Sequence, residues 1–253
     1  MKKDVVAGLG EIGFPIYNTL SKFFQIEGYD INKKLIPKNQ KIISSRTRFL
    51  HICIPYNNNF ISNTNKLKKK FNPEIIVIHS TVKPGTTKKI QQRTEVPVIY
   101  SPIRGVHKRM SKDLKRYVKF FSLDKKIKSS KNASHLYSQI MKKSGIKTKK
   151  ISNTITLELS KIICDTSYYG WLINYSQISK MIADKYSVDY DEMWLFSDEI
   201  HKFLGNRPKM FPGFIGGHCV IPNLELIDEK SLNQIDQINK IFKKSLIANG
   251  IKK

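Results

Sequence analysis

The sequence predicts an α/β fold, a doubly wound and mainly parallel sheet followed by a smaller all-helical domain. In the first half of the chain, short apolar runs alternate with amphipathic stretches, which is the pattern of a parallel sheet covered by helices. After Lys150, long helical patterns replace the short apolar runs. We therefore expect a first domain at residues 1–150 and a second at 151–253.

The expected elements follow from these patterns in order. Apolar runs separated by polar segments with Pro or Gly predict strands at residues 4–7, 25–30, 49–54, 75–80, 96–100 and 118–123. The second half predicts one long helix over 154–186, another over 190–204 and a final polar helix over 224–249. A loop rich in Gly and Pro, residues 208–223, connects the last two helices.

The chain is strongly basic. Lys and Arg number 45 against 20 Asp and Glu, a formal net charge of +25, which should concentrate anionic ligands around the molecule. The alternative is a compositional bias, since Lys far outnumbers Arg. No recognisable nucleic-acid module is present. We expect a small anionic ligand and no nucleic acid.

Nothing in the sequence predicts a membrane protein or a metal site. The basic start leads directly into a glycine loop, so no signal peptide is expected. The longest stretch without Asp, Glu, Lys or Arg, residues 49–65, is polar in its second half and is unsuited to span a bilayer. Three cysteines without metal-ligand spacing favour a reducing compartment. We expect a soluble, cytoplasmic protein.

A glycine motif follows the first expected strand. Gly8-Leu9-Gly10-Glu11-Ile12-Gly13 fits the Rossmann pattern G-x-G-x-x-G and opens an expected helix over 14–24. Gly8 would allow the tight turn, Gly10 the approach of a pyrophosphate, and Gly13 close packing of helix on sheet. Asp30 ends the next strand, where an acid accepts from ribose hydroxyls and repels the extra phosphate of NADP. The motif predicts an NAD site, with Pro55 as a further candidate; the alternative is a glycine-rich turn without a ligand.

Two residues in the second half could carry chemistry. Cys219 lies on a glycine-rich loop, and a thiolate is a good nucleophile toward an aldehyde carbon. Lys161 lies at helical spacing with Leu157, Cys164 and Tyr168, where a partly buried lysine could hold a substrate proton or polarise a carbonyl. The alternatives are a small buried hydrophobe for Cys219 and an ordinary ion pair of Lys161 with Asp165.

Basic residues follow the fifth expected strand. Arg104 and His107, with Lys108 and Arg109 behind them, would lie near the carboxyl edge of the sheet, where such folds bind ligands. They could hold a phosphate or carboxylate. The alternative is a basic surface loop.

With these motifs together, the chain resembles the UDP-glucose/GDP-mannose dehydrogenase family. Four segments match in order: Gly8 to Gly13, Ser80-Thr81-Val82-Lys83-Pro84-Gly85-Thr86-Thr87, Glu158-Leu159-Ser160-Lys161, and Gly216-Gly217-His218-Cys219 with Pro222 behind it. The resemblance implies NAD as cofactor and two oxidations of a nucleotide sugar, from alcohol to aldehyde to acid.

The resemblance also implies roles for individual residues. Cys219 would form a thiohemiacetal and then a thioester, Lys161 would be the polar catalyst, and Thr81 would lie beside the cofactor or position a water. Gly216 and His218 would contact substrate. A homodimer through the long helix is implied, and the uncharged residues 166–179, with Tyr168, Trp171 and Tyr175, are compatible with burial on several sides.

The chain also departs from the family pattern. Asp165 stands where the family usually has Asn, Asn223 where it has Asp, and Ile103 where it often has Glu. Family members are usually longer and end in a second α/β domain that binds the nucleotide, so we expect a short, divergent relative without that domain.

Three functions remain open at this stage. The first is an NAD-dependent oxidoreductase that acts on an alcohol group of an anionic, sugar-derived substrate, in two steps if Cys219 takes part. The second is a single-step β-hydroxyacid-type dehydrogenase that uses Lys161. The third is a non-catalytic NAD-binding regulatory protein, which the altered Asp165 and Asn223 would favour.

Overall fold

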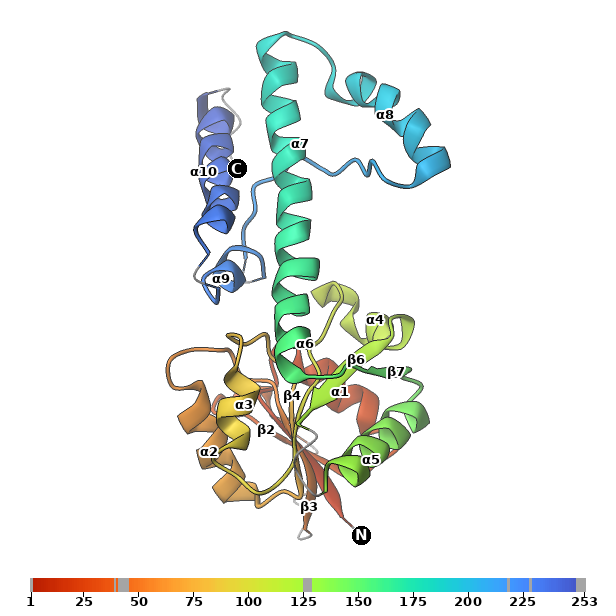
Figure 1. Cartoon of the computed structure of the whole chain (residues 1–253), viewed down its shortest axis with the longest axis vertical. Coiled ribbons are helices and arrows are strands. Elements are labelled where there is room, and N and C mark those ends of the chain that lie inside the picture. The colour runs from red at the N-terminus through yellow and green to blue at the C-terminus, as the bar shows by residue number, and fades with distance from the viewer. Residues whose placement is uncertain are drawn as a thin grey trace. The chain divides into compact units, whose positions relative to one another are not determined.

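The structure is a computed structural model (Figure 1) that describes residues 2–38, 40, 46–124, 129–217, 219–227 and 229–248. It divides into two compact units, Met1–Leu159 and Ser160–Lys253. The division therefore falls later than the expected boundary at residue 150. The reason lies in helix α6 (Thr154–Ser160), because Leu157 packs into a core of the sheet and the Glu158 carboxylate bonds to a loop of the first unit.

The first unit is built on a seven-stranded sheet of order β2-β1-β3-β4-β5-β6-β7. Strands β1 to β5 are parallel, β6 is antiparallel to β5, and β7 is parallel to β6. From β1 the chain proceeds to one side for β2 and to the other for β3, so the topological switch point lies between β1 and β3. The strands are β1 Lys3–Ala7, β2 Ile26–Tyr29, β3 Thr47–Ile52, β4 Ile75–Ile78, β5 Val98–Tyr100, β6 Lys119–Leu123 and β7 Thr148–Lys150.

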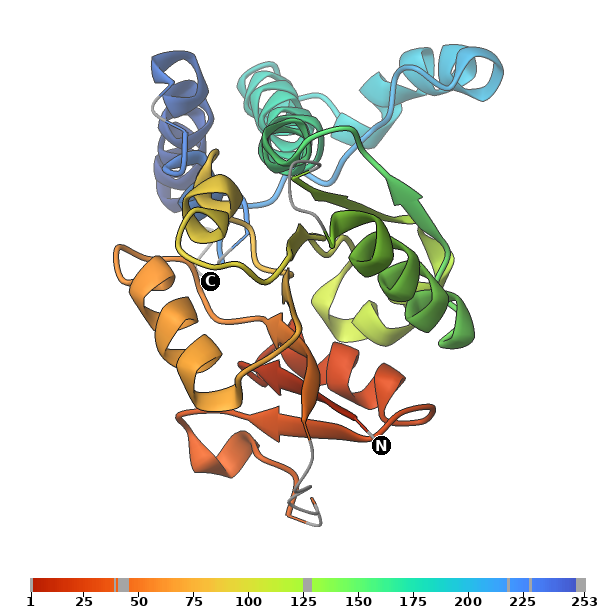
Figure 2. The same cartoon turned by 60° about the horizontal axis from the view of Figure 1, so that its bottom comes forward.

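Two apolar cores cover the two faces of this sheet, because alternate strand residues point to opposite sides. Val6 and Phe49 belong to a core with α1, α4 and α5, whereas Val5 and Leu50 belong to a core with α2, α3 and α6. Figure 2 shows α2 and α3 (orange and yellow) on one side of the sheet and α1 and α5 (red-orange and green) on the other. These helices are α1 Gly13–Leu20, α2 Phe60–Phe71, α3 Thr86–Gln91, α4 Met110–Arg116 and α5 Ser130–Lys143.

The strands expected from apolar runs are all present, and the doubly wound α/β fold is confirmed. β7 was not expected, because it reads Thr-Lys-Lys, lies at the edge of the sheet and leaves both lysines exposed. Such a strand carries no apolar signal. The first helix ends at Leu20, earlier than the expected residue 24.

The second unit is helical, as expected. It contains a π-helix (Lys161–Ser167), α7 (Tyr168–Lys185), α8 (Tyr190–Leu204), α9 (Ile221–Leu224), a 3₁₀ turn (Lys230–Leu232) and α10 (Asn233–Ala248). The expected bounds of α8 are correct, because the Asp189 carboxylate caps its first turn through the Glu192 N–H and Gly205, at φ 64°, ends it. The single helix expected over 154–186 instead contains the π segment. In the described part of the chain, every helix is too short or too polar to cross a membrane.

A pair of buried histidines lies within the first unit. Nδ1 of His51 is 2.9 Å from Nε2 of His79, and Nδ1 of His79 is 2.9 Å from the Ser101 carbonyl oxygen. The carbonyl can only accept, so His79 donates from Nδ1 and accepts at Nε2 from His51. Burial, with the Lys119 ammonium as a second cause, lowers the pKa of His51 to about 3 and that of His79 well below its usual value. Both rings are therefore neutral.

Acid should destabilise the protein through these rings. In the unfolded chain they take up protons near pH 6.5, but in the fold they resist protonation, so each lowers the free energy of unfolding by about 1.4 kcal/mol per pH unit below that point. His51→Asn, which keeps a donor for His79 but does not titrate, should make urea unfolding less pH-dependent between about pH 6 and 4. The exposed His135 on α5 offers a control, His135→Gln, that should change nothing. If the free energy of unfolding of His51→Asn varied with pH as steeply as that of the unmodified protein, the assignment of neutral rings to His51 and His79 would be contradicted.

Candidate functional site

The glycine loop after β1 is shaped by close backbone contacts. Gly8 has φ 91°, and a Cβ there would lie 2.8 Å from the Cys53 carbonyl carbon. A Cβ on Gly13 would lie 1.6 Å from the Gly8 carbonyl oxygen. At Gly10, in contrast, an added Cβ would meet nothing within 4 Å. The outer glycines thus allow the fold, while the middle one leaves open space above the loop.

Asp30 links this loop to the end of β2. One oxygen of its carboxylate accepts from the Leu9 N–H at 2.7 Å and the other from the Asn32 N–H at 2.8 Å. Asp30 therefore lies against the glycine loop, where the motif placed it. The side chains of Leu9 and Ile12 pack on the core, so only their backbone groups could face a ligand, whereas Glu11 is exposed.

The loops after β3 and β4 lie beside the glycine loop. The Cys53 and Ile54 backbone is in close contact with Gly8, and the Ser80 hydroxyl donates to the Ile54 carbonyl oxygen at 2.6 Å. Pro55 is exposed and Thr81 is half-buried on these two loops. The structure thus brings the candidate cofactor-binding residues of the first unit to one edge of the sheet, at its switch point.

Glu158 holds the loop that follows β4. Its carboxylate accepts from the Gly85 N–H at 2.6 Å, the Thr87 N–H at 2.9 Å and the Thr87 hydroxyl at 2.6 Å. Burial raises the pKa of Glu158, although these three hydrogen bonds oppose that rise. Sequence analysis named Glu158 only as part of a family motif. The signal for its role was a carboxylate between two leucines of an otherwise uncharged helical stretch.

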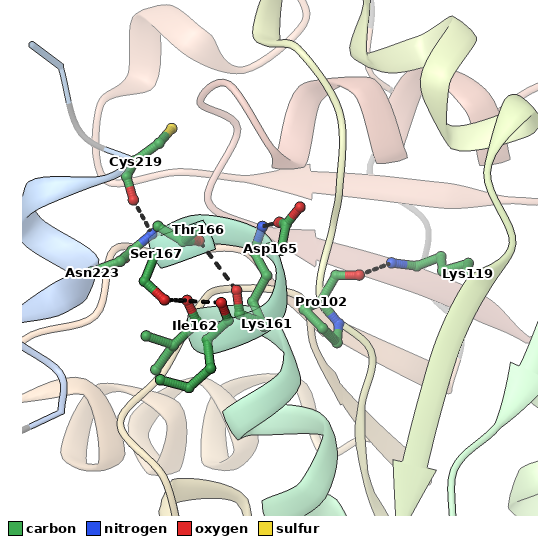
Figure 3. Close-up of polar contacts among 10 residues, drawn as sticks. Pro102, Lys119, Lys161, Ile162, Asp165, Thr166, Ser167, Cys219 and Asn223 are labelled. Atoms are coloured by element: carbon green, nitrogen blue, oxygen red, sulfur yellow. Dashed lines mark hydrogen bonds and ion pairs between the residues drawn. The ribbon is translucent and has the colours of Figure 1, made fainter. Parts of the chain in front are cut away.

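In the second unit, Lys161 opens the π-helix and pairs with Asp165. Nζ of Lys161 lies 2.5 Å from Oδ2 of Asp165, and the lysine side chain is 14% exposed against 42% for the aspartate (Figure 3). Partial burial of Lys161 was expected, but Cys164 and Tyr168 are exposed, so the expected stripe is not a core face. The ion pair that sequence analysis left as an alternative is present.

Two hydroxyls bond to carbonyl groups of the π-helix: Thr166 donates to the Lys161 carbonyl oxygen at 3.2 Å, and Ser167 donates to the Ile162 carbonyl oxygen at 3.0 Å. Segments of π-helix are rare and are frequently found at functional sites. Because a π-helix has more residues per turn than an α-helix, this segment rotates the side chains of α7 about the helix axis relative to Lys161.

The cysteine loop lies beside the π-helix within the second unit. Cys219 is exposed, and α9, which begins two residues after it, packs against the π-helix. Nδ2 of Asn223 donates to the Cys219 backbone carbonyl oxygen at 2.6 Å, as Figure 3 shows. Asn223 therefore holds the backbone of the loop. Gly216 is exposed, and His218 lies outside the described residues.

The basic residues after β5 have partners inside the first unit. Arg104 donates to the Val118 carbonyl oxygen at 2.6 Å and lies over the Phe120 ring at 4.9 Å, while Arg109 pairs with Asp113 at 2.9 Å. The side chain of His107 is outside the described part. Ile103, found where the family often has Glu, is buried in the core that includes α1 and α4.

Neither a cluster of metal-ligating side chains nor a disulfide is found among the described residues. Within the ranges that the structure describes, no three His, Cys, Asp or Glu side chains converge to hold a metal ion. None of the three cysteines forms a disulfide, and burial raises the pKa of the Cys53 thiol.

Solved nucleotide-sugar dehydrogenases have the same fold as this chain. The UDP-D-ManNAc dehydrogenase of Pyrococcus horikoshii superposes with a TM-score of 0.76 at 19% identity, covering 99% of this chain and 73% of that one. The UDP-glucose dehydrogenase of Pyrobaculum islandicum superposes with a TM-score of 0.72 at 15% identity, covering 96% and 67%. The resemblance expected from the four motifs is thereby confirmed at the level of the fold.

A second kind of dehydrogenase also shares this fold. The 3-hydroxyisobutyrate dehydrogenase of Mycobacterium tuberculosis superposes with a TM-score of 0.59 at 11% identity, covering 100% of this chain and 89% of that one. No protein-family model and no curated protein matches the sequence.

The role of Glu158 can be measured as stability. Glu158→Ala leaves two backbone N–H groups and one hydroxyl without their acceptor, so we expect the free energy of unfolding to fall by about 2 to 3 kcal/mol in urea titrations. Glu95→Ala, which removes an exposed carboxylate of the same unit, is the control and should change it little. Equal stability of the two variants would show that the loop after β4 does not depend on Glu158.

Proposed function

We propose that this protein is an NAD-dependent oxidoreductase that oxidises an alcohol group of an anionic, sugar-derived substrate. The observation that carries the proposal is the edge of the first unit's sheet, where open space above Gly10 meets the Asp30 carboxylate at the switch point. A dinucleotide fits such an edge, since its pyrophosphate needs close backbone approach and its ribose needs an acceptor.

NAD would supply a hydride acceptor for the substrate carbon. The glycine loop would hold its pyrophosphate, Asp30 would accept from the adenosine ribose hydroxyls, and Pro55 and Thr81 would line the same edge. The four family motifs and the shared fold of dehydrogenases support this assignment. The surplus of 45 Lys and Arg over 20 acids favours an anionic substrate.

Lys161 and Cys219 would act on the substrate in sequence. Lys161 would hold the reacting hydroxyl: its ammonium would donate a hydrogen bond to the substrate oxygen, or its neutral amine would receive the hydroxyl proton. Either role requires Lys161 to exchange its partner Asp165 for the substrate oxygen. The Cys219 thiolate would then attack the aldehyde carbon to form a thiohemiacetal, which would lose a hydride to a second molecule of NAD and become a thioester. Hydrolysis of that thioester would release the acid.

A single-step β-hydroxyacid-type dehydrogenase is the second candidate. It is favoured by the Asn223 amide, which binds the Cys219 backbone carbonyl and offers no carboxylate to the thiol. The fold shared with 3-hydroxyisobutyrate dehydrogenase is consistent with it. In this reading Lys161 would serve alone and Cys219 would be incidental.

We also propose a homodimer through α7. Within the second unit, this helix leaves Tyr168 57% exposed and Tyr175 65% exposed, whereas Trp171 packs partly against the core formed by Ile215 and its neighbours. Exposed aromatic side chains gathered on one helix are typical of an interface.

Cofactor preference tests the role of Asp30. Asp30→Asn keeps an oxygen for the Leu9 N–H but removes the charge that repels the NADP phosphate, so the preference for NAD over NADP should narrow by about tenfold in calorimetry. Glu11→Gln, on the same loop, is the control: it shows how much the loss of any one negative charge changes the preference for NAD over NADP. Tighter binding of NADP than of NAD by the unmodified protein would overturn the assignment.

Substitutions at the two candidate catalytic positions separate the mechanisms. Cys219→Ser should stop a two-step reaction at or before the aldehyde, because a serine hydroxyl is a far weaker nucleophile near pH 7, while NAD binding survives. Lys161→Ala should slow the first hydride transfer by about a hundredfold. NADH released per substrate is the measurement. One NADH from the unmodified enzyme, with full activity in Cys219→Ser, would replace the two-step mechanism by the β-hydroxyacid type.

Mass in solution tests the dimer. Tyr175→Glu places a charge on the exposed face of α7 and should shift light-scattering mass from dimer to monomer, because burying an unpaired carboxylate is costly. Glu192→Gln on α8 is a control that should leave the mass unchanged. A monomeric mass for the unmodified protein at micromolar concentration would contradict the proposal.

A further inference from the structure

A cluster of buried side-chain amides lies in the second unit, between α7, α10 and the segment that leads to Cys219. It consists of Asn174 and Gln177 on α7, both 0% exposed, and Asn239 on α10, 2% exposed. Burial of an amide costs free energy unless it is hydrogen-bonded. We call Asn174, Gln177 and Asn239 the amide cluster.

The amide cluster is bonded mainly to the backbone of the cysteine loop. Oδ1 of Asn239 accepts from the Ile215 N–H at 2.8 Å, and its Nδ2 donates to the Ile215 carbonyl oxygen at 3.0 Å. Gln177 donates from Nε2 to the Gly213 carbonyl oxygen at 2.7 Å and to Oδ1 of Asn239 at 3.0 Å. Asn239 therefore pairs with Ile215 as a neighbouring strand would.

Asn174 completes the cluster from the other side. Its Nδ2 donates to Oε1 of Gln177 at 2.8 Å and to the Ile235 carbonyl oxygen at 3.2 Å. The first bond fixes the orientation of the Gln177 amide, so that its Nε2 faces the loop. The second ties the cluster to α10.

The two sides of Cys219 are thus both anchored. Before it, Ile215 is buried and held by Asn239. After it, Val220 is buried against Gly170, where an added Cβ would lie 2.9 Å from Cγ1 of Val220. Gly216 and Gly217 lie between the first anchor and the cysteine, and Gly217 has φ 78°, a conformation that glycine adopts without strain.

We propose that Asn239 and Gln177 are positioning residues for Cys219: by fixing residues 213–215 they present the thiol at one place for the second oxidation. The inference rests on the proposed two-step function. A core made only of apolar side chains would leave the N–H and C=O of Ile215 and the C=O of Gly213 without partners, which buried backbone groups rarely tolerate. The amides satisfy them without forming a regular strand, so the loop keeps its turn toward α9.

The test uses the whole 253-residue chain and two readouts, one that does not depend on turnover and one that does. Asn239→Leu removes both bonds to Ile215 at similar side-chain volume, and Gln177→Met removes the bond to Gly213. Gln237→Leu, at an exposed position of the same helix, is the surface control. Phe242→Leu, at a buried position of α10, is the control for general loss of packing.

Hydrogen exchange followed by mass spectrometry tests directly whether Asn239 holds the backbone at Ile215. In Asn239→Leu, we expect amide exchange over residues 213–217 to speed up by about tenfold or more, with α7 and α8 unchanged. The two controls should keep the original exchange of this segment. Unchanged exchange in Asn239→Leu would overturn the proposal, whatever the activity.

The rates of the two oxidation steps, measured with NAD, then test whether the thiol of Cys219 is correctly positioned. Both amide variants should keep the first hydride transfer within about twofold but slow acid formation by about tenfold or more, since a displacement of about 1 Å can cost a hundredfold. Phe242→Leu should preserve the ratio of the two steps. If exchange over residues 213–217 became faster while the ratio of the two oxidation rates stayed the same, the amide cluster would have only a structural role and the proposal would be overturned. Failure of the proposed function itself is seen separately, as a single NADH per substrate in the unmodified enzyme.

Discussion

Three loops of the candidate site have backbone N–H groups that donate to no neighbouring strand, and one buried or half-buried side chain accepts from each. Asp30 accepts from Leu9 in the glycine loop, Glu158 from Gly85 and Thr87 in the loop after β4, and Asn239 from Ile215 before the cysteine. An unsatisfied buried donor costs about 1 to 3 kcal/mol, so these acceptors decide whether the loops hold one conformation. The site depends on them before it depends on any reacting group.

This use of acceptors also bears on the charge of the molecule. Acids are scarce, 20 against 45 Lys and Arg, and several serve internal partners. Asp4 is fully buried against Arg48, Asp113 binds the Val106 N–H and Arg109, and Glu158 holds a loop. The other acids are too few to balance the 45 Lys and Arg, and the molecule keeps a formal net charge of +25, which would favour the approach of an anionic substrate.

The sequence predicted those parts of the fold that depend on local patterns. Apolar runs predicted β1 to β6, and the helical pattern predicted α8 with its correct bounds. β7 was not predicted because its lysines are exposed and it carries no apolar run, and no pattern marked the π-helix. The amide cluster was not predicted because a polar side chain is buried only when a distant part of the chain supplies its partner. Asn239 needs Ile215, and Glu158 needs Thr87.

The sequence pattern of helix α7 likewise did not predict which of its faces would be buried. Its uncharged sequence suggested burial on several sides, yet within the second unit it buries Gly170, Asn174 and Gln177 and leaves Tyr168 and Tyr175 exposed. Periodicity separates the faces of a helix but does not say which face meets a neighbour in the same chain. Here the polar face meets α10, and the aromatic face is the one available to a partner.

Two of the three departures from the family pattern, Asp165 and Asn223, differ in their consequences for catalysis. The carboxylate of Asp165 is 42% exposed, so its ion pair with Lys161 is partly screened by solvent and contributes on the order of 0 to 1 kcal/mol. A substrate hydroxyl could displace it at small cost, and the first oxidation would survive. Asn223 differs, because its amide is bound to the Cys219 backbone and carries no charge that could accept a proton near the thiol or activate water. The second oxidation and the hydrolysis of a thioester are therefore the steps that replacement of the family's Asp by Asn223 would slow most. Whether the reaction would proceed beyond one oxidation depends on whether the anchored Cys219 loop activates the thiol without that carboxylate.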